Sequence, residues 1–299
     1  MDLPVPLLPS PLQPLIDATT QRAGIRLYLK RDDLIHPTIS GNKWRKLKFI
    51  LQDARQQGYL TLLTFGGARS NHLFATAAAG SLLGLNTIGL VRGEEYVSKT
   101  TETLDFCRTQ GMRIQALSRA MYRRRDDPGY VEELKGTYPN AYIIPEGGTT
   151  ALALPGVGEL VRETETQLGF KPDYYAVAAG TGGTAAGVLD ADARVLAFAA
   201  LKGGDFLKGE ILRLTNQAEA EGRLQLFTDY HFGGYARHQP DLLHFMQDFE
   251  QAHGTLLEHV YTGKMLFGLY DLLKKGFFSK GTTLVAIHTG GLQGRSHTN

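Results

Sequence analysis

Hydrophobic residues recur in two patterns along the chain, and the two patterns alternate from residue 59 onward. Apolar runs of four to seven residues, typical of buried strands, alternate with longer segments whose apolar residues lie three and four positions apart, typical of helices. The connections between these segments are short. This order predicts right-handed βαβ units, and therefore parallel sheets that are covered by helices on both faces.

The patterns give definite expectations for each element. We expect strands at Tyr59–Phe65, Asn86–Val91, Arg113–Leu117, Ala141–Ile144, Asp173–Ala178, Arg194–Ala199, Leu224–Phe227 and Thr282–His288. We expect helices at Asn71–Leu83, Thr100–Thr109, Tyr130–Gly136, Gly156–Leu168, Thr184–Leu189 and Asp205–Ala220, and near residues 239–253 and 262–275. The glycine-rich segment Pro145–Thr150 is the best candidate for a hinge, and it divides the chain into two α/β units.

Composition narrows the class of protein without identifying it. The 299 residues carry a formal net charge of +2 and a single Cys. The near-neutral charge gives no reason to expect a nucleic-acid or membrane-surface partner, and one Cys excludes an internal disulfide or a multi-Cys zinc site. The nine histidines show no metal-site spacing. Prolines spaced through Met1–Leu15 predict an extended arm rather than an export signal, so we expect a cytoplasmic protein.

Glycine is the one residue type in excess, with 35 of 299 residues against a usual ~7%. Many glycines directly follow a strand-like run, at Gly66-Gly67, Gly147-Gly148, Gly182-Gly183 and Gly290-Gly291. Open α/β sheets bind ligands outside the carboxyl ends of their strands, where the backbone must approach the ligand closely. The glycines therefore indicate a ligand-binding edge.

The loop Gly180-Thr181-Gly182-Gly183-Thr184 is the strongest single signal of binding. It joins a strand to a helix of small residues, so N–H groups, two hydroxyls and a helix N-terminus would surround a phosphate. A plain tight turn is the alternative interpretation. The loop also fits a dinucleotide fingerprint, but the next strand ends in Ala199-Ala200-Leu201-Lys202, without the acid that binds ribose.

A basic helix provides a second signal. In Ser40–Leu51, the side chains of Lys43, Lys46, Leu47 and Ile50 share one face, at positions i, i+3, i+4 and i+7. Leu47 and Ile50 require burial, and a lysine kept near apolar surface has the lowered pKa that amine chemistry needs. A solvated basic face is the alternative interpretation.

A third signal, Ser70-Asn71-His72, begins the alanine-rich helix after Gly66-Gly67. The free N–H groups of a helix N-terminus suit a substrate carboxylate. Simple helix capping by Ser70 or Asn71 is the alternative.

Together these segments resemble pyridoxal-phosphate enzymes of the tryptophan-synthase-β type (fold type II). Within that group they resemble the 1-aminocyclopropane-1-carboxylate deaminase and D-cysteine desulfhydrase family. The matching segments are Leu29–Leu34, Gly41–Leu47, Ser70–His72, Thr181–Thr184, Val260–Lys264 and His288–Gly291, in family order over nearly the whole chain. Each match is short, whereas the ordered set is specific.

The resemblance implies an α/β architecture with two open parallel-sheet domains in three layers and an active site in the cleft between them. A large domain of residues 1–46 and 148–299 would bind the cofactor, and residues 47–147 would form a small domain. Relatives of this kind form homodimers, so we expect one here. The implied partner is a small amino-acid substrate.

The resemblance also implies a role for each matched residue. Lys43 would hold pyridoxal phosphate covalently and move the Cα proton of the substrate, with Lys46 near the phosphate. The phosphate would be held by Thr181, Gly182, Gly183 and Thr184. Asn71 would contact the cofactor 3-hydroxyl, while Ser70, Asn71 and His72 would receive the substrate carboxylate. Tyr235 and Tyr261 would flank the substrate, and Thr262 and Thr289 would lie near the cofactor ring. The implied catalytic residues are Lys43, Ser70, Tyr235 and Tyr261.

Two threonines bear on the reaction. The deaminase branch has an acid at the position of Thr262 and a leucine at that of Thr289, whereas threonines at both are typical of the desulfhydrase branch. His72 also follows the desulfhydrase pattern. We therefore expect α,β-elimination from a small D-amino acid, with D-cysteine giving pyruvate, sulfide and ammonia.

Several alternatives remain open at this point. They are a cyclopropane-opening deaminase, a racemase or dehydratase of the same fold type, and a non-catalytic module that binds a phosphate ligand. Two departures from the family pattern put the substrate in doubt. Ser40 replaces a common Gly, and Phe74 replaces a common Arg, a change that could narrow or dry the pocket.

Overall fold

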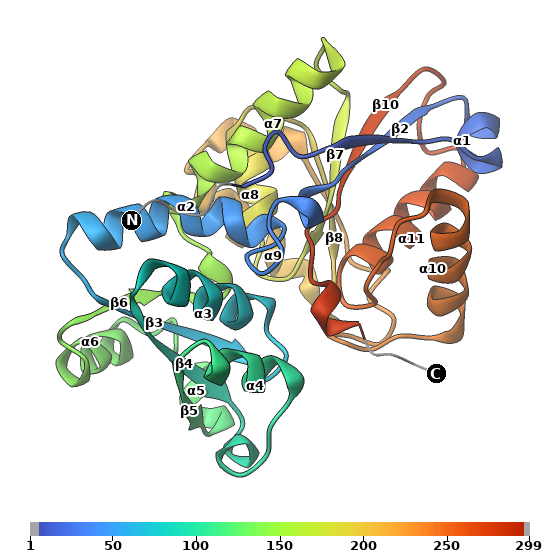
Figure 1. Ribbon diagram of the computed structural model, residues 1–299. Helices are drawn as coiled ribbons and strands as arrows, with labels where there is room; N and C mark the ends of the chain where they lie inside the picture. Colours follow the sequence, from blue (N-terminus) through green and yellow to red (C-terminus); the bar gives the residue numbers. More distant parts are fainter. Residues whose placement is uncertain (1–5, 296–299) are drawn as a thin grey trace.

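The computed structural model describes residues 6–295 and contains two β-sheets (Figure 1). The first sheet has the strand order β1-β2-β10-β7-β8-β9, and the second has the order β5-β4-β3-β6. Neighbouring strands are parallel except for the antiparallel pair β1 and β2. The whole second sheet lies in sequence between β2 and β7, so the chain leaves the first sheet once and returns once.

The elements have the following bounds. The strands are β1 Leu12–Leu15, β2 Arg26–Lys30, β3 Thr61–Gly67, β4 Asn86–Arg92, β5 Met112–Leu117, β6 Ala141–Ile144, β7 Tyr174–Ala179, β8 Val195–Ala199, β9 Leu224–Phe227 and β10 Thr283–Ile287. The helices are α1 Ala18–Ala23, α2 Asn42–Gln56, α3 Asn71–Leu83, α4 Glu102–Thr109, α5 Arg119–Arg123, α6 Pro128–Thr137, α7 Leu154–Leu168, α8 Gly183–Asp190, α9 Leu207–Thr215, α10 Pro240–His253 and α11 Thr262–Lys274.

Every strand and helix expected from the sequence forms, and most ends agree within two residues. The largest difference is in α9, which ends at Thr215 rather than near Ala220 because Asn216 takes a left-handed conformation with φ of 51°. The N-terminal segment also differs from the expected arm. Residues 12–15 form β1 at the edge of the first sheet, where Pro14 is tolerated because an edge strand need not donate every N–H. Pro4 lies outside the described residues.

The first sheet is the middle of three layers. Helices α7, α8 and α9 cover one face with a core that includes Val157, Leu160 and Val188. Helices α10 and α11 cover the other face with a core that includes Leu242 and Leu266. The predicted architecture of parallel-sheet α/β units in three layers is confirmed. Among residues 6–295, no helix is both long and apolar enough to cross a membrane.

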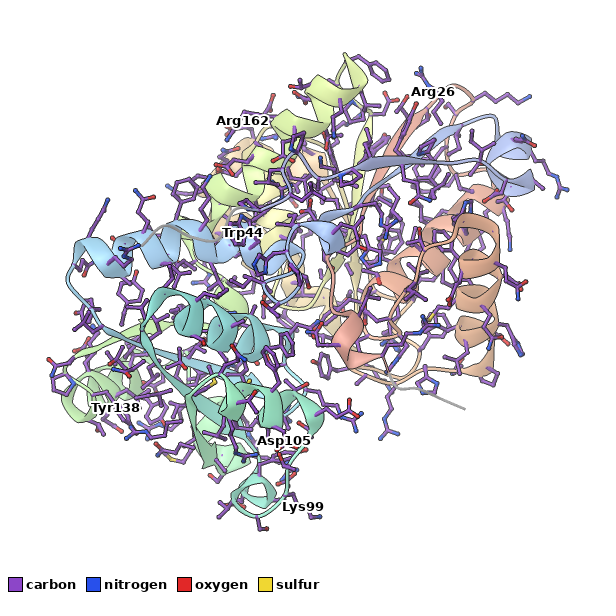
Figure 2. All side chains as sticks on the ribbon, viewed as in Figure 1. Arg26, Trp44, Lys99, Asp105, Tyr138 and Arg162 are labelled. Carbon is purple, nitrogen blue, oxygen red and sulfur yellow. The ribbon has the colours of Figure 1, made fainter. Side chains whose placement is uncertain are left out.

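Helix α2 runs between the two sheets (Figure 2). Trp44, the only tryptophan of the chain, is buried with Leu47 and Ile50 against Leu62 of β3 and Ala75 of α3. The expected domain boundary at residues 46 and 47 thus falls inside one continuous helix. The division into residues 1–46 plus 148–299 and 47–147 stays a prediction.

A buried charge network fixes α2 to the elements of the first sheet and the helices that cover it. Both guanidinium edges of Arg45 are used: Nε and Nη2 donate to the Asp32 carboxylate at 2.6 and 2.8 Å, and Nη1 and Nη2 donate to Glu163 at 3.0 and 2.9 Å. The Ser10 hydroxyl also donates to Asp32, at 2.6 Å. Asp32 and Arg45 are 0% and 1% exposed, so this network sets the axial position of α2.

Removing one partner of this buried network should strongly destabilise the fold. Asp32→Ala leaves Arg45 and Ser10 without their main acceptor, and we expect a loss of about 3–5 kcal/mol in the free energy of unfolding. Asp105→Ala, which breaks an exposed ion pair with Arg108, should cost less than about 1 kcal/mol. Denaturant unfolding measures both, and equal losses would show that the network has no special weight.

Candidate active site

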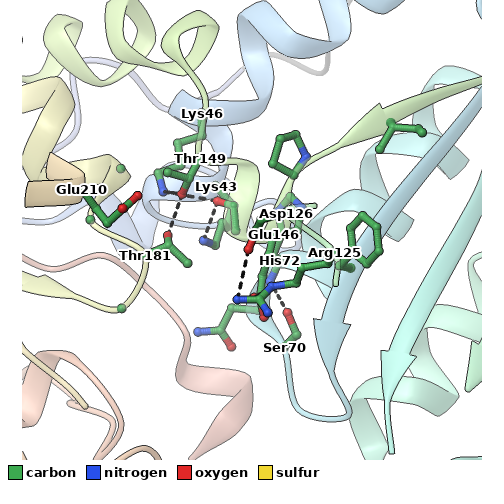
Figure 3. A pocket seen from close by; sticks show the side chains of 18 of the residues that line it. Lys43, Lys46, Ser70, His72, Arg125, Asp126, Glu146, Thr149, Thr181 and Glu210 are labelled. Carbon is green, nitrogen blue, oxygen red and sulfur yellow. Dashed lines mark hydrogen bonds and ion pairs between the residues drawn. The ribbon is translucent and has the colours of Figure 1, made fainter. Parts of the chain in front are cut away.

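A cavity of about 1210 Å³ lies between the two sheet units. Its walls come from the start of α2, the start of α3, residues 145–149, the loop between β7 and α8, and the segments that carry Tyr235, Tyr261 and Thr289. Every site residue expected from the sequence lines this cavity except Thr262. Figure 3 shows how side chains from both units face one another across it.

The two lysines of α2 project into the cavity from one helix face. Lys43 Nζ and Lys46 Nζ donate to the same acceptor, the Gly147 carbonyl, at 3.3 and 3.2 Å. The helix can begin here because Gly41 has φ of 63° and no side chain. A Cβ at Gly41 would lie only 1.9 Å from the Thr289 carbonyl oxygen. The close approach of the Thr289 backbone therefore fixes where α2 begins, and so where Lys43 and Lys46 lie.

Burial changes the acid–base behaviour of both lysines. It lowers the pKa of Lys43 to about 8, although the nearby Glu146 carboxylate opposes the shift. At pH 7, roughly 10% of such an amine is neutral, against roughly 0.03% of an ordinary lysine. Burial and the charge of Lys43 together hold the pKa of Lys46 well below its usual range. Both amines therefore lose their protons more readily than an ordinary lysine, and an anion bound beside Lys46 would favour its charged form.

The loop after β7 forms an anion-binding cup. Gly182 has φ of 79° and directly precedes α8, whose first N–H groups have no partner within the helix. Thr181 Oγ1 lies 2.6 Å from Thr149 Oγ1, and the Thr149 hydroxyl accepts from Lys46 Nζ at 3.3 Å. Helix N–H groups, hydroxyls and a buried ammonium therefore converge, an arrangement that suits a phosphate dianion.

Glycine is required at the bottom of this cup. A Cβ at Gly183 would lie 2.8 Å from both Lys46 Nζ and Thr149 Oγ1. Thr184 forms the next position, and its hydroxyl accepts from the Asn42 amide at 2.8 Å. Helices α2 and α8 thus meet at the cup.

Helix α3 presents Ser70, Asn71 and His72 to the cavity. The Ser70 hydroxyl caps the helix by accepting from the N–H groups of His72 and Leu73. Asn71 accepts from Gln293 at 2.8 Å through its carbonyl oxygen, which leaves its NH₂ group as a donor. The Ser70 hydroxyl proton and the Asn71 amide are therefore the groups here that can donate to a carboxylate.

His72 is buried and is best described as a neutral acceptor. Its Nε2 lies 2.8 Å from Thr64 Oγ1, whose own proton goes to the Ile144 carbonyl, so Nε2 must carry the hydrogen. Nδ1 is then an unprotonated nitrogen, and it is buried without a partner. Burial and the nearby charges of Lys43 and Lys46 hold the pKa of His72 well below its usual range. His72 offers no positive charge to a carboxylate.

Tyr235 and Tyr261 stand together at the cavity wall. Their ring centroids are 6.0 Å apart in an edge-to-face arrangement. Burial and the neighbouring Tyr235 phenol hold the pKa of Tyr261 well above its usual range, so its hydroxyl stays protonated. The ring of Tyr261 also covers the position where a Cβ of Gly180 would lie.

The two threonines from the sequence comparison are placed differently. Thr289 lines the cavity, whereas Thr262 is fully buried at the start of α11. The Thr262 hydroxyl donates to the Glu258 carboxylate at 3.0 Å, and that carboxylate also accepts from backbone N–H groups of residues 260–262. Thr262 and Glu258 together cap α11 and so fix the direction of Tyr261.

Sequence reasoning missed several residues of the cavity. Thr149 and the Gly147 carbonyl come from the segment that was interpreted as a hinge and, through Gly147-Gly148, as part of a ligand-binding edge, without a role for either group. Glu146 pairs with Arg125 at 2.5 Å and accepts from Tyr122 at 2.6 Å. The threonine after the Gly-Gly pair resembles the one in Thr181–Thr184, and this was the only available signal.

The two departures from the family pattern lie outside the chemistry. Phe74 does not line the large cavity but stacks on Phe106, with ring centroids 3.7 Å apart, so the expectation that it narrows the pocket is wrong. Ser40 packs beside Gly290, where its hydroxyl oxygen would lie 2.9 Å from a Cβ. Both substitutions support the walls rather than shape the interior.

Comparisons with known proteins agree on the class. Residues 6–196 match the family described as pyridoxal-phosphate dependent enzyme. A putative 1-aminocyclopropane-1-carboxylate deaminase of Pyrococcus abyssi is 36% identical over 93% of this chain and 88% of its own length. A D-cysteine desulfhydrase of Klebsiella pneumoniae is 31% identical over 95% of this chain and 92% of its own. The crystal structure of an ACC deaminase homologue covers 98% of this chain and 92% of its own, with a TM-score of 0.83 and 31% identity.

The chain therefore belongs to the family of pyridoxal-phosphate dependent enzymes. The residues of the cavity fit this cofactor. Lys46 is a buried amine that forms no ion pair within residues 6–295, and a phosphate beside it would favour its charged form. Gly183 leaves room where a side chain would block the cup. Lys43 supplies an amine of lowered pKa in the same cavity. No group of three metal-ligating side chains is present in the described part of the chain.

The cup predicts a specific effect of one added methyl group. Gly183→Ala should push the Lys46 ammonium and the Thr149 hydroxyl out of the cup, and weaken pyridoxal-phosphate binding at least about tenfold with the fold intact. Gly209→Ala in α9, where nothing lies within 4 Å, is the matched control and should bind normally. Titration of the cofactor, followed by quenching of Trp44 fluorescence, measures both dissociation constants. Equal affinities would contradict the assignment of the cup.

The lowered pKa of Lys43 predicts a pH dependence. Only the neutral amine attacks an aldehyde, so the rate of covalent cofactor attachment should rise with pH and level off above about 8. The Glu146 carboxylate raises this pKa, so Glu146→Gln should move the midpoint to lower pH. Glu132→Gln on the exposed face of α6 should leave it in place. Stopped-flow absorbance of the cofactor measures the rates, and a midpoint near 10.5 would contradict this account.

Proposed function

We propose that the protein is a lyase that catalyses α,β-elimination from a small D-amino acid, with D-cysteine as the principal substrate. D-Cysteine and water would give pyruvate, hydrogen sulfide and ammonia. The observation that carries this proposal is the pairing of a low-pKa lysine, Lys43, with a phosphate cup and a carboxylate-binding helix start in one cavity. The relative from Klebsiella pneumoniae named D-cysteine desulfhydrase supports the choice of substrate.

Each wall of the cavity has a task in this proposal. Lys46, Thr149 and residues 181–184 hold the phosphate of the cofactor, which anchors it at one end. Lys43 holds the cofactor covalently at rest and, once displaced by substrate, takes the proton from Cα through its free amine. Its pKa of about 8 suits this task, because a general base works best near the operating pH. The bound cofactor supplies the electron sink that makes the Cα proton acidic and lets the β-thiol leave.

The opposite wall orients the amino acid. The Ser70 hydroxyl and the Asn71 amide donate to the substrate carboxylate at the start of α3. The Asn71 amide is also the group proposed to contact the cofactor 3-hydroxyl, and His72 contributes an acceptor rather than a charge. Tyr235 and Tyr261 flank the side chain of the substrate. Their neutral phenols can hydrogen-bond the leaving sulfur without repelling it as phenolates would.

The threonines favour elimination over ring opening. A carboxylate beside the cofactor ring would stabilise its protonated form, which helps to open an unreactive cyclopropane. Thr289 places a hydroxyl in the cavity instead, and Thr262 is committed to Glu258. A hydroxyl suffices when a thiol leaves. The deaminase names of other relatives make 1-aminocyclopropane-1-carboxylate deamination to 2-oxobutyrate and ammonia the alternative function.

We also propose a homodimer, a cytoplasmic location, and a small domain of residues 47–147. These proposals come from the sequence and from the resemblance to the family. The four-stranded sheet supports the domain proposal, since β3 to β6 span residues 61–144.

Product analysis tests the function directly. With pyridoxal phosphate and D-cysteine, the protein should release pyruvate and sulfide, and Lys43→Ala should lower kcat by about 10²–10⁴-fold. Lys48→Ala is the matched control, because Lys48 is on the same helix but pairs with Glu159 outside the cavity. Faster formation of 2-oxobutyrate from the cyclopropane amino acid would favour the alternative. Wild-type turnover by Lys43→Ala would refute both.

A further inference from the structure

Lys264 is a fully buried lysine that has no part in the proposed function. Lys264, in the first turn of α11, is 1% exposed. Its Nζ donates to three backbone carbonyls, those of Gly234 at 2.8 Å, His231 at 2.9 Å and Ala200 at 3.3 Å. Burial lowers the pKa of Lys264 to about 8, opposed by Glu258, so the group is still mainly a cation at neutral pH. A buried ammonium with all three donors used is a strong local tether.

Two of these three carbonyls, those of His231 and Gly234, belong to a loop that needs a tether. Four successive or neighbouring residues of the loop, Phe232, Gly233, Gly234 and Ala236, have positive φ of 51°, 92°, 122° and 54°. This conformation is energetically unfavourable for Phe232 and Ala236, because a side chain disfavours positive φ. A loop of this kind persists only where surrounding contacts determine it.

Helix α11 provides those contacts from one face. Lys264, Phe267 and Asp271 are at positions i, i+3 and i+7, so they form a single stripe. Phe267 packs edge-to-face on Phe232 with ring centroids 4.9 Å apart, and Asp271 accepts from the Tyr230 hydroxyl at 2.6 Å. Lys264 holds the part of the loop nearest the cavity.

Tyr235 directly follows Gly234, the loop residue that Lys264 binds most closely. Its side chain lines the cavity yet the residue is 49% exposed, with one ring contact, to Tyr261. The ring contact and the side-chain hydrogen bond of Tyr235 are both with Tyr261, so the rest of its positioning must come from the backbone of its own loop. Tyr261 is placed by the start of α11, three residues before Lys264. The same helix end thus places both tyrosines, one directly and the other through the loop.

We propose that Lys264 is a positioning residue that holds the 231–234 loop on α11 and so keeps Tyr235 opposite Tyr261 at the substrate. The consequence for turnover rests on the proposed function, in which Tyr235 flanks the substrate. The tethering of the loop does not. The two parts can therefore be tested separately.

Hydrogen exchange tests the tether without cofactor or substrate. Lys264→Met keeps the chain length of the side chain and removes the charge, and it should raise the exchange rate of peptide 230–237 at least about tenfold at pH 7. The amides of Gly233, Gly234 and Arg237 are hydrogen-bonded within this loop and report on it. Lys264→Arg, which retains a cation with several donors, should restore most of the protection.

A matched variant separates this effect from general loss of stability. Lys30 is also a fully buried lysine, bound to Ser10, Gln167 and Glu163 far from the loop. Lys30→Met should lower stability but leave the exchange of peptide 230–237 as in the wild type. If Lys264→Met leaves this peptide protected, or if Lys30→Met exposes it equally, the tether is refuted.

A double-mutant cycle tests the link to turnover. Lys264→Met and Tyr235→Ala should each lower kcat/KM for D-cysteine by about tenfold or more, and the double variant should lose no more than Tyr235→Ala alone. Multiplying losses would mean that Lys264 acts independently of Tyr235 and would overturn the proposal. If the wild type does not act on D-cysteine, the proposed function fails, while the exchange result still decides the tether.

Discussion

The structure depends on how α2 buries three cationic side chains within its first two turns. Arg45 points to Asp32 and Glu163, so its charge is compensated by the protein. Lys43 and Lys46 point to the cavity and share only the Gly147 carbonyl. Burial lowers the pKa of both lysines, and the charge of Lys43 lowers the pKa of Lys46 further. Protein carboxylates thus compensate the charge on the Arg45 side of the helix, whereas a ligand must compensate the charge on the lysine side.

Because Lys43 and Lys46 have, among residues 6–295, no carboxylate partner of the kind that Arg45 has, binding of the cofactor affects the stability of the cleft. A phosphate in the cup places negative charge beside Lys46, between residues of both sheet units. Any ligand that binds only the folded chain stabilises it by mass action. The unfavourable free energy of burying the Lys46 amine is then offset when the phosphate binds. The same electrostatic interaction therefore contributes both to cofactor affinity and to the stability of the fold.

Much of the fold could be predicted because parallel strands are buried on both faces and read as continuous apolar runs. Strand β2 was missed because its apolar centre is short and has a charged residue, Arg26 or Lys30, at each end. The glycines and lysines of the site carried local signals as well. Thr149 carried only the weak signal of a Gly-Gly-Thr sequence, since its importance arises from a contact with Thr181 across 32 positions of sequence. The prediction that Phe74 faces the pocket was wrong because of helix geometry. Two residues after His72, a side chain is rotated by about 200° around the helix and faces away from the cavity.

The single excursion of the chain into the second sheet has a mechanical consequence. The two crossings between the sheets are α2 with its following turn, and residues 145–153. The first carries Lys43 and Lys46, and the second carries the Gly147 carbonyl and Thr149 that bind them. A rotation of one unit against the other must therefore pivot at the lysines. The parts of the two units that lie away from these crossings would move most, so the cleft can admit an amino acid while its reactive centre stays assembled.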